Sequence, residues 1–245
     1  MSSRKPFLRA KAYGVHVLTA SGIIPAALAM HEITQSRCDP RIVFLYLLAA
    51  TLIDAIDGPL ARRYHVKSNA SAIDGRTIDD LLDYLTFAFI PLMLIWRMGW
   101  MPEGAGWTVV LAMGASLFGF AHCQAKDESA GFFRGFPSYW NIFAFYAGIA
   151  STQVSPWLTA ISLWILTLLT VSPVRVLYPN LTPPPWKAWI LGGAVVWSLC
   201  MILMLYFYPA PDPAITWISL VYPAFYSIAS LYLARRQQGG APAEP

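Results

Sequence analysis

The chain has 245 residues, of which 57% are apolar and only 12% are charged. Soluble globular domains carry roughly 25% charged residues, so this composition excludes an ordinary water-soluble domain and indicates lipid as the main solvent. The net charge of +4 reflects membrane topology and gives no reason to expect a nucleic-acid partner. The three cysteines are scattered and fit neither a disulfide framework nor a zinc site. They are Cys38, Cys123 and Cys200.

Several apolar runs approach the roughly 20 residues that cross a hydrocarbon core. They predict an all-α integral membrane protein with about eight transmembrane helices. The basic, partly apolar opening between Arg4 and Tyr13 predicts a short N-terminal amphipathic segment, with a frayed basic terminus as the alternative. Residues 1–236 are expected to form a single polytopic membrane domain, and 237–245 a disordered tail rich in Gly, Pro and Ala. The predicted spans lie near residues 14–33, 41–61, 77–96, 106–125, 139–155, 157–174, 187–208 and 214–233.

The basic residues test this topology independently. With the N-terminus in the cytoplasm, all but three of the 17 Lys and Arg fall on the inner side of the predicted spans. The exceptions are Arg37, Arg41 and Arg97. Because Lys and Arg concentrate on the cytoplasmic side of membrane proteins, both termini are expected there. That result requires an even number of spans.

Four aspartates lie where the predicted spans would bring them into the membrane. Asp54 and Asp57 stand three residues apart near the inner end of the second span, and Asp79 and Asp83 stand four apart at the start of the third. Each pair therefore shares one face of its helix. Since a short cytoplasmic connection joins the two antiparallel helices, we expect the four carboxylates to converge just below the inner surface.

Clustered carboxylates in a membrane repel one another and are costly to bury. Two divalent cations would balance four negative charges, and carboxylate ligands favour Mg²⁺ or Mn²⁺ over zinc or copper. The alternative, structural ion pairs with Arg62, Arg63 or Arg76, is disfavoured because these three arginines must also face the headgroups. Gly58 and Ala61 leave room beside the first pair, either for a nucleotide or for close helix packing.

These residues resemble the signature of the CDP-alcohol phosphotransferase family, D-x2-D-G-x2-A-R, a spacer, then G-x3-D-x3-D. The resemblance implies that Asp54, Asp57, Asp79 and Asp83 bind Mn²⁺ or Mg²⁺, with Asp79 and Asp83 catalytic, and charge balance favours two ions. Asp83 would also be the general base that deprotonates the acceptor hydroxyl. The expected CDP-binding residues are Gly58, Ala61, Arg62 and Gly75.

The spacer between Arg62 and Gly75 has twelve residues, whereas most family members have eight. The longer spacer, the segment 131–146 and the length resemble the bacterial branch that joins CDP-diacylglycerol directly to choline. That branch implies phosphatidylcholine and CMP as products and CDP-diacylglycerol, choline and membrane lipids as partners. It also implies an inner-membrane location with a cytoplasmic active site, and it leaves a homodimer open.

Choline carries a quaternary ammonium without an N–H donor, so aromatic rings are expected to bind it through cation–π attraction. Interfacial belts and packing are the alternative use of such rings. The candidates are Tyr84, Tyr139, Trp140 and Tyr146. Arg134 and Arg175 are candidates for a lipid phosphate, with positive-inside topology as their alternative role.

Other functions remain open at this point. Another family member would use serine, inositol or glycerol phosphate as acceptor, although a phosphorylated acceptor favours a basic pocket over aromatic-rich spans. Intramembrane prenyltransferases also use two aspartate motifs, but theirs lie far apart in the chain. An ion-coupled transporter usually carries its acidic residues near the midplane between structural repeats, and the sequence has no repeat that we can identify.

Overall fold

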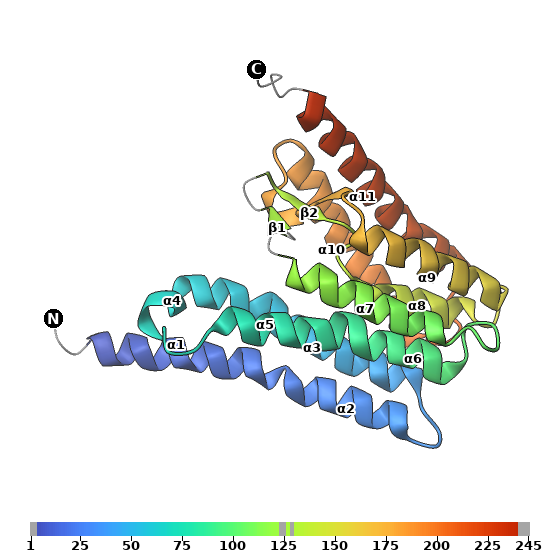
Figure 1. Ribbon diagram of the computed structural model, residues 1–245, viewed down its shortest axis with the longest axis horizontal. Coiled ribbons are helices and arrows are strands. Elements are labelled where there is room, and N and C mark those ends of the chain that lie inside the picture. The colour runs from blue at the N-terminus through green and yellow to red at the C-terminus, as the bar shows by residue number, and fades with distance from the viewer. Residues whose placement is uncertain (1–3, 123–125, 128–129, 240–245) are drawn as a thin grey trace. The chain divides into compact units, whose positions relative to one another are not determined.

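The computed structural model describes residues 4–122, 126–127 and 130–239, and nearly all of its regular structure is helical (Figure 1). The predicted all-α membrane protein is therefore confirmed. Contacts between Cα atoms divide the chain into two compact units. The first comprises Met1–Trp100 and Tyr139–Tyr146, and the second comprises Met101–Ser138 and Ala147–Pro245.

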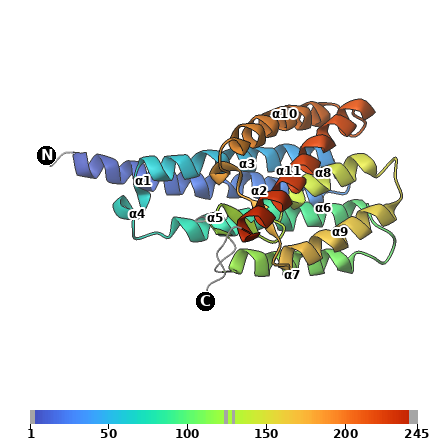
Figure 2. The same ribbon diagram turned by 90° about the horizontal axis from the view of Figure 1, so that it is seen from above.

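The first unit is a layer of helices. α1 and α2 follow one another with a break at Gly22 and pack along α3, while α5 packs against α1 (Figure 2). At the far end of α2, the Arg97 guanidinium donates hydrogen bonds to the carbonyls of Ile33, Gln35 and Ser36. The segments are α1 (Arg4–Ser21), α2 (Ile23–Thr34), α3 (Pro40–Arg63), α4 (Val66–Asn69), α5 (Gly75–Asp83), the π-helix η1 (Tyr84–Phe89), α6 (Ile90–Met98) and the start of α8 (Trp140–Ala150).

The basic N-terminal opening is helical, but it is not a separate element. It forms the first turns of α1 and runs without a break into the first predicted span. The Lys11 ammonium lies 4.4 Å from the centroid of the Phe7 ring and 5.3 Å from that of Tyr64, so cation–π attraction contributes to the order of these turns.

The twelve-residue spacer folds against α1. Within it, α4 places Val66 and Ala70 in a small apolar cluster with Ala12 and Val15 of α1. Asn69 Nδ2 donates to the backbone carbonyl of Tyr64 at 2.8 Å. The extra length therefore joins α1 to the carboxyl end of α3 and the amino end of α5 instead of forming an open loop.

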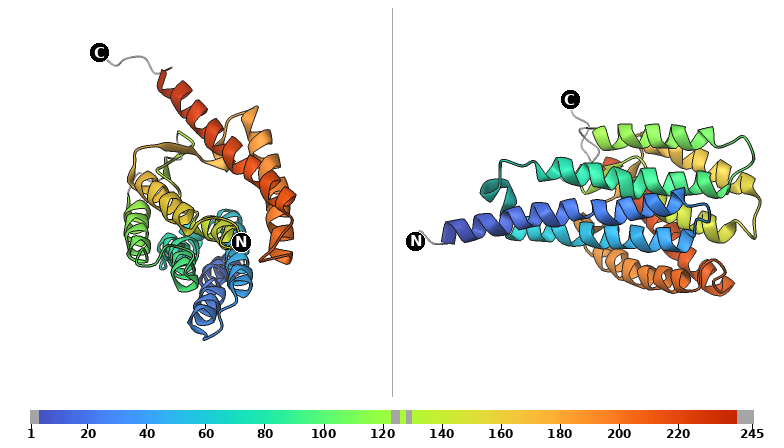
Figure 3. Two further views of the ribbon diagram at one scale, coloured as in Figure 1. Left: turned by 90° about the vertical axis from the view of Figure 1, so that its right-hand side faces the viewer. Right: turned by 90° about the horizontal axis from the view of Figure 1, so that it is seen from below.

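The second unit contains two helix pairs and a small sheet. α7 packs on α9, α10 packs on α11, and the antiparallel sheet has the strand order β1-β2-β3 (Figure 3). The bounds are α7 (Trp107–Ala121), β1 (Lys126–Asp127), β2 (Phe132–Arg134), the rest of α8, α9 (Pro156–Val171), β3 (Arg175–Leu177), the 3-10 turn η2 (Pro179–Leu181), α10 (Trp186–Tyr206) and α11 (Pro213–Gly239).

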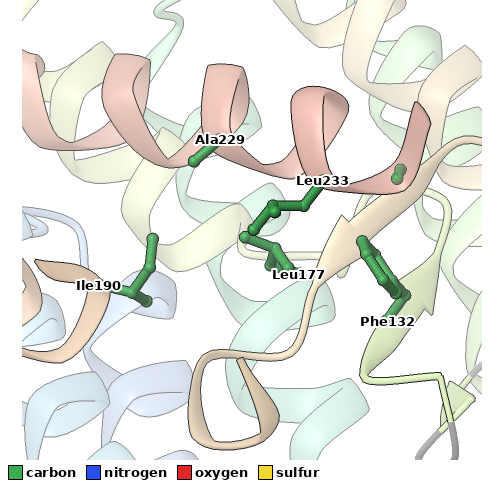
Figure 4. Close-up of a cluster of buried hydrophobic side chains, with 6 residues drawn as sticks. Phe132, Leu177, Ile190, Ala229 and Leu233 are labelled. Carbon is green, nitrogen blue, oxygen red and sulfur yellow. The ribbon is translucent and has the colours of Figure 1, made fainter. Parts of the chain in front are cut away.

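The edge strand β3 is held by α11. The backbone N–H of Leu177 donates to Ser230 Oγ at 3.2 Å, and the Tyr226 hydroxyl donates to the Leu177 carbonyl. These hydroxyl groups replace the partners that a further strand would supply, which satisfies the exposed edge. Figure 4 shows apolar side chains of β2, β3, α10 and α11 that form one buried cluster. The buried members are Phe132, Leu177, Ile190, Ala229, Leu233 and Ala234.

Side-chain caps mark the beginnings of four helices. In each case a short polar side chain accepts a hydrogen bond from the backbone N–H two residues later, which satisfies one orphan donor of the first turn. The pairs are Asp39 with Arg41, Asp74 with Arg76, Ser155 with Trp157, and Asp212 with Ala214.

Each of the eight predicted spans coincides with helix in the structure. Within the described residues, four helical stretches are long and apolar enough to cross a membrane, and three shorter helices are apolar as well. Two predicted boundaries are wrong, because α7 ends at Ala121 and α8 ends at Ala150. Residues 237–239, assigned to the tail, continue α11, and 240–245 lie outside the described residues. The eight passes and the single catalytic domain stay predictions.

Candidate active site

Three of the four predicted aspartates meet at one point in the first unit. One carboxylate oxygen from each of Asp54, Asp57 and Asp79 lies within 4.8 Å of the other two. Asp57 is buried, with 6% of its surface exposed, and the other two are half-buried. The convergence predicted from the three- and four-residue spacings is therefore found where α3 and α5 come together.

Asp83 lies one turn beyond Asp79 and lines the same small pocket. The pocket has a volume of about 20 Å³, enough for one guest the size of a water molecule. Thr19 of α1 and Thr86 of η1 also line it. All four aspartates of the motif thus face one space, and two hydroxyl-bearing residues border it.

The donor set fits a hard divalent cation. Two carboxylates 4.8 Å apart repel by about 3 kcal/mol at an effective dielectric constant near 20, and the three carboxylates nevertheless converge. All three donors are oxygens, the ligands that Mg²⁺ and Mn²⁺ prefer. The nearby Arg76 pairs with Asp80, with 3.5 Å between Nε and Oδ2, and Asp80 lies outside the motif. These three carboxylates are thus arranged to bind a metal ion.

The start of α5 is fixed by Asp74. Its carboxylate accepts hydrogen bonds from the Thr77 hydroxyl at 2.8 Å and from the Arg76 backbone N–H at 3.1 Å. The bond from Thr77, followed by that from Arg76, lowers the pKa of Asp74 below its usual value. The negative charge also suits the positive end of the helix dipole, so this cap fixes the helix that carries Asp79 and Asp83.

Gly58 and Ala61 differ in their surroundings. A Cβ atom built on Gly58 would come no closer than 3.6 Å to another group, the Arg62 Nη1 atom, which is an ordinary van der Waals distance. Among the described residues, that exposed guanidinium is the one group within 4 Å of this Cβ position, so the space beside Gly58 is open there. Ala61, in contrast, is partly buried against the α1–α4 cluster, so its small side chain serves packing.

Gly75 permits a close contact that the sequence did not reveal. A Cβ atom at Gly75 would lie 2.7 Å from Cε1 and 2.9 Å from Nδ1 of His16. His16 is buried on α1, and its Nε2 lies 3.3 Å from the carbonyl oxygen of Ala70. The imidazole thus joins α1, the spacer and the first residue of α5. His16 thus provides both a packing contact and a polar contact.

A π-helical segment follows Asp83 directly, and hydrophobic periodicity did not predict it. In η1 the backbone hydrogen bonds span five residues, as between the Ile90 N–H and the Leu85 carbonyl. Such wide turns occur frequently at functional sites in otherwise α-helical segments. Here the change of helix type lies immediately after the proposed catalytic base.

The four choline candidates are not brought together at the aspartate pocket. Tyr84 follows Asp83 in η1, Tyr139 directly precedes α8, Trp140 begins it and Tyr146 lies in its middle, and none of the four lines the pocket. Trp140 is fully buried and packs edge to face on Phe143, with ring centroids 5.9 Å apart. Tyr146 packs beside Phe145 at 6.2 Å. Packing accounts for Trp140 and Tyr146, and Tyr84 is the nearest candidate to Asp83 along the chain.

The two lipid-phosphate candidates are neighbours in the second unit. Arg134 of β2 is directly opposite Arg175 of β3 in the antiparallel ladder. Residues in such register have side chains on the same face with Cβ atoms about 5 Å apart, and two like charges there are destabilising. A bound anion would relieve that repulsion.

Comparison with known proteins agrees with the motif. The family model described as CDP-alcohol phosphatidyltransferase matches residues 16–199. A phosphatidylcholine synthase of Pseudomonas aeruginosa is 32% identical over 242 residues, which cover 97% of this chain and 98% of the relative. The phosphatidylcholine synthase of Legionella pneumophila is 31% identical over 90% of this chain and 88% of its own length. That of Rhizobium meliloti is 31% identical, with 85% of each chain covered.

Proposed function

Because the chain belongs to the CDP-alcohol phosphatidyltransferase family, we propose that it transfers the phosphatidyl group of CDP-diacylglycerol to choline. The products are phosphatidylcholine and CMP. The observation that carries the reaction class is the meeting of Asp54, Asp57 and Asp79 beside Asp83. The choice of choline rests on the relatives named phosphatidylcholine synthase and on the twelve-residue spacer.

The metal ligands in this proposal are Asp54, Asp57 and Asp79, with Asp83 sharing in binding. When bound, Mn²⁺ or Mg²⁺ ions neutralise the diphosphate and stabilise charge on the leaving phosphate. Four carboxylates balance two such ions. The pocket that these aspartates line has room for one water-sized guest.

Asp83 acts as the base. Its carboxylate accepts the proton of the choline hydroxyl, and the oxygen of choline forms a bond to the β-phosphorus, which bears diacylglycerol. The bond from that phosphorus to the bridging oxygen breaks in line, and CMP leaves with the electron pair. Asp79 lies one turn before the base on α5 and keeps the two carboxylates on one face.

Four further motif residues are assigned to CDP. The open space beside Gly58 supports a direct approach of the nucleotide to α3, with the exposed Arg62 guanidinium near its phosphates. Ala61 and Gly75 shape this region less directly. They allow α1 and α4 to pack closely against α3 and α5, and so keep the motif helices in place.

Choline would contact aromatic faces next to the base. Among the candidates, Tyr84 is half-buried and adjacent to Asp83, so we assign it the main contact with the choline ammonium. Tyr139, Trp140 and Tyr146, just before and within α8, support the wall of the choline site. Arg134 and Arg175, opposite one another in the sheet, bind a lipid phosphate.

The protein resides in the bacterial inner membrane in this proposal, with eight passes and with both termini and the active site in the cytoplasm. The bacterial relatives and the asymmetry of Lys and Arg support that orientation. A homodimer is compatible with the proposal, which does not depend on it.

One competition assay tests the function. The purified full chain, in detergent with Mn²⁺ or Mg²⁺, receives CDP-diacylglycerol and an equimolar mixture of choline, serine, inositol and glycerol 3-phosphate. Mass spectrometry of the lipid products is expected to detect phosphatidylcholine, with CMP formed in equal amount. A different phospholipid would refute choline as acceptor, and absence of CMP would refute the reaction class.

A further inference from the structure

A second pocket lies within the second unit, beside the amino end of α10 and the carboxyl end of α11. It has a volume of about 370 Å³ and shares no lining residue with the aspartate pocket. Its floor is apolar and includes Phe132, Trp186 and Leu233, while Arg236 and Gln237 form a polar edge. No residue of the eight-position motif lies in it, so the proposed transfer reaction does not account for it.

The apolar floor of this second pocket is held in place by packing within the protein. Phe132 and Leu233 belong to the buried cluster between the sheet and α11 (Figure 4). Trp186 stacks on Phe225 with ring centroids 6.5 Å apart and an interplanar angle of 22°. Because these side chains are fixed by packing on other elements, a ligand would find the apolar surface already in place and would lose little free energy in ordering it.

The edge is positively charged. Gln237 Nε2 donates to the carbonyl of Ala130 at 3.3 Å, which ties the last turns of α11 to the approach to β2. Arg236 is exposed, and no ion pair to it is found among the described residues. Arg235 and Lys187 at the same ends of α11 and α10 are also exposed. A ligand that complements the charge of this edge is therefore an anion.

The ends of α10 and α11 that border the pocket carry the residue types of a membrane interface. α10 and α11 pack on one another, and the Tyr222 hydroxyl donates to the Ile190 carbonyl at 3.0 Å. Trp189, one turn into α10, is 71% exposed. Exposed Trp together with Lys and Arg at helix ends is typical of the cytoplasmic membrane interface, and basic pockets between transmembrane helices on that side bind anionic headgroups.

We propose that this pocket binds an anionic membrane phospholipid. The lipid phosphate pairs with the Arg236 guanidinium, and the glycerol backbone with its first acyl carbons covers Trp186 and Leu233. A choline headgroup is disfavoured, because its quaternary ammonium would meet a positive edge. The site is therefore distinct from one that binds the zwitterionic product, and it makes the protein responsive to the anionic lipid around it.

Native mass spectrometry of the purified full chain tests the proposal. The probe is dioleoyl phosphatidylglycerol, titrated against wild type, Arg236→Gln and the control Arg235→Gln, whose side chain does not line the pocket. A direct charge-assisted contact between a guanidinium and a lipid phosphate contributes about tenfold or more in affinity. We expect at least that loss in Arg236→Gln and less than a twofold change in the control.

Three results would overturn the proposed binding of an anionic lipid. Equal losses in the two variants would mean that general surface charge attracts the lipid. Equal affinity of wild type for dioleoyl phosphatidylcholine would remove the requirement for an anion. Full displacement of the lipid by 10 mM inorganic phosphate, an order-of-magnitude excess over typical lipid affinities, would reduce the pocket to a site for a free ion. None of these measurements depends on turnover, so the proposed transfer reaction can fail while the lipid site stands.

Discussion

The open space beside Gly58 allows steric effects on the protein to be separated from those on its substrate. In Gly58→Ala, the added methyl group would meet no protein atom closer than 3.6 Å. The same change at Gly75 would bring the methyl group within 2.7 Å of the buried His16 ring. Only the first substitution leaves the protein's own packing intact, so an effect of Gly58→Ala on activity would report the approach of CDP to α3.

The expected magnitudes differ for folding and turnover. Replacing Gly by Ala inside a helix stabilises it by about 1 kcal/mol, whereas the following Pro59 disfavours a Cβ in helical geometry and offsets part of that gain. The melting temperature should therefore change by less than about 4 °C. Forcing a methyl group into a filled contact costs roughly 1–3 kcal/mol. If CDP fills the space, kcat/KM for CDP-diacylglycerol should fall about 5- to 150-fold.

The assay follows CMP release at varied CDP-diacylglycerol, with thermal unfolding measured on the same preparations. Gly14→Ala is the matched control, because Gly14 is also helical and its Cβ would meet nothing within 4 Å. This control should keep wild-type activity. If Gly58→Ala keeps kcat/KM within about twofold of wild type, CDP does not approach α3 there, and the Gly58 assignment is wrong.

Three further predictions concern the base, the metal and the helix cap. Asp83→Asn should lower kcat by about 10²- to 10⁴-fold without changing membrane insertion. The control Asp80→Asn, which removes the carboxylate that pairs with Arg76, should remain active. Near-normal turnover of Asp83→Asn would exclude a base role for Asp83. Chelation with EDTA should abolish CMP release, and added Mn²⁺ or Mg²⁺ should restore it; persistent activity would contradict a metal requirement. Because hydrogen bonding lowers the pKa of Asp74 in the folded protein, its stabilising effect is fully present above its unfolded pKa near 4 and is lost as the pH falls below that value. Asp74→Ala should therefore melt earlier than wild type at pH 7, and by a smaller margin as the pH falls from there through the lowered pKa of the folded protein; a difference that does not change with pH would rule out this linkage.

The aspartate site could be predicted because its geometry is local. Spacings of three and four residues fix which face of a helix carries two side chains, whatever the rest of the chain does. A short connection between two spans then brings the faces together. Asp54, Asp57 and Asp79 therefore meet as expected, and Asp83 lines the same pocket.

The contacts that support the site depend on residues far apart in the chain. His16 meets Gly75 across 59 positions, and no periodicity of either segment signals that contact. The opposition of Arg134 and Arg175 depends on the register of two three-residue strands, which are too short for an alternating pattern to identify. The predicted spans also ran past the ends of α7 and α8, where polar residues such as His122 and Ser151 follow the apolar runs.

The π-helix after Asp83 bears on how labelling experiments along the third span should be interpreted. A turn with hydrogen bonds over five residues holds about one residue more than an α-turn, and each residue of an α-helix corresponds to a rotation of about 100°. A helical wheel drawn from Asp79 and extended through Ile90 would therefore misplace the lipid-facing side of α6 by about that angle. Cysteine-accessibility scans of this span need two separate wheels, one ending at Asp83 and one beginning after Phe89.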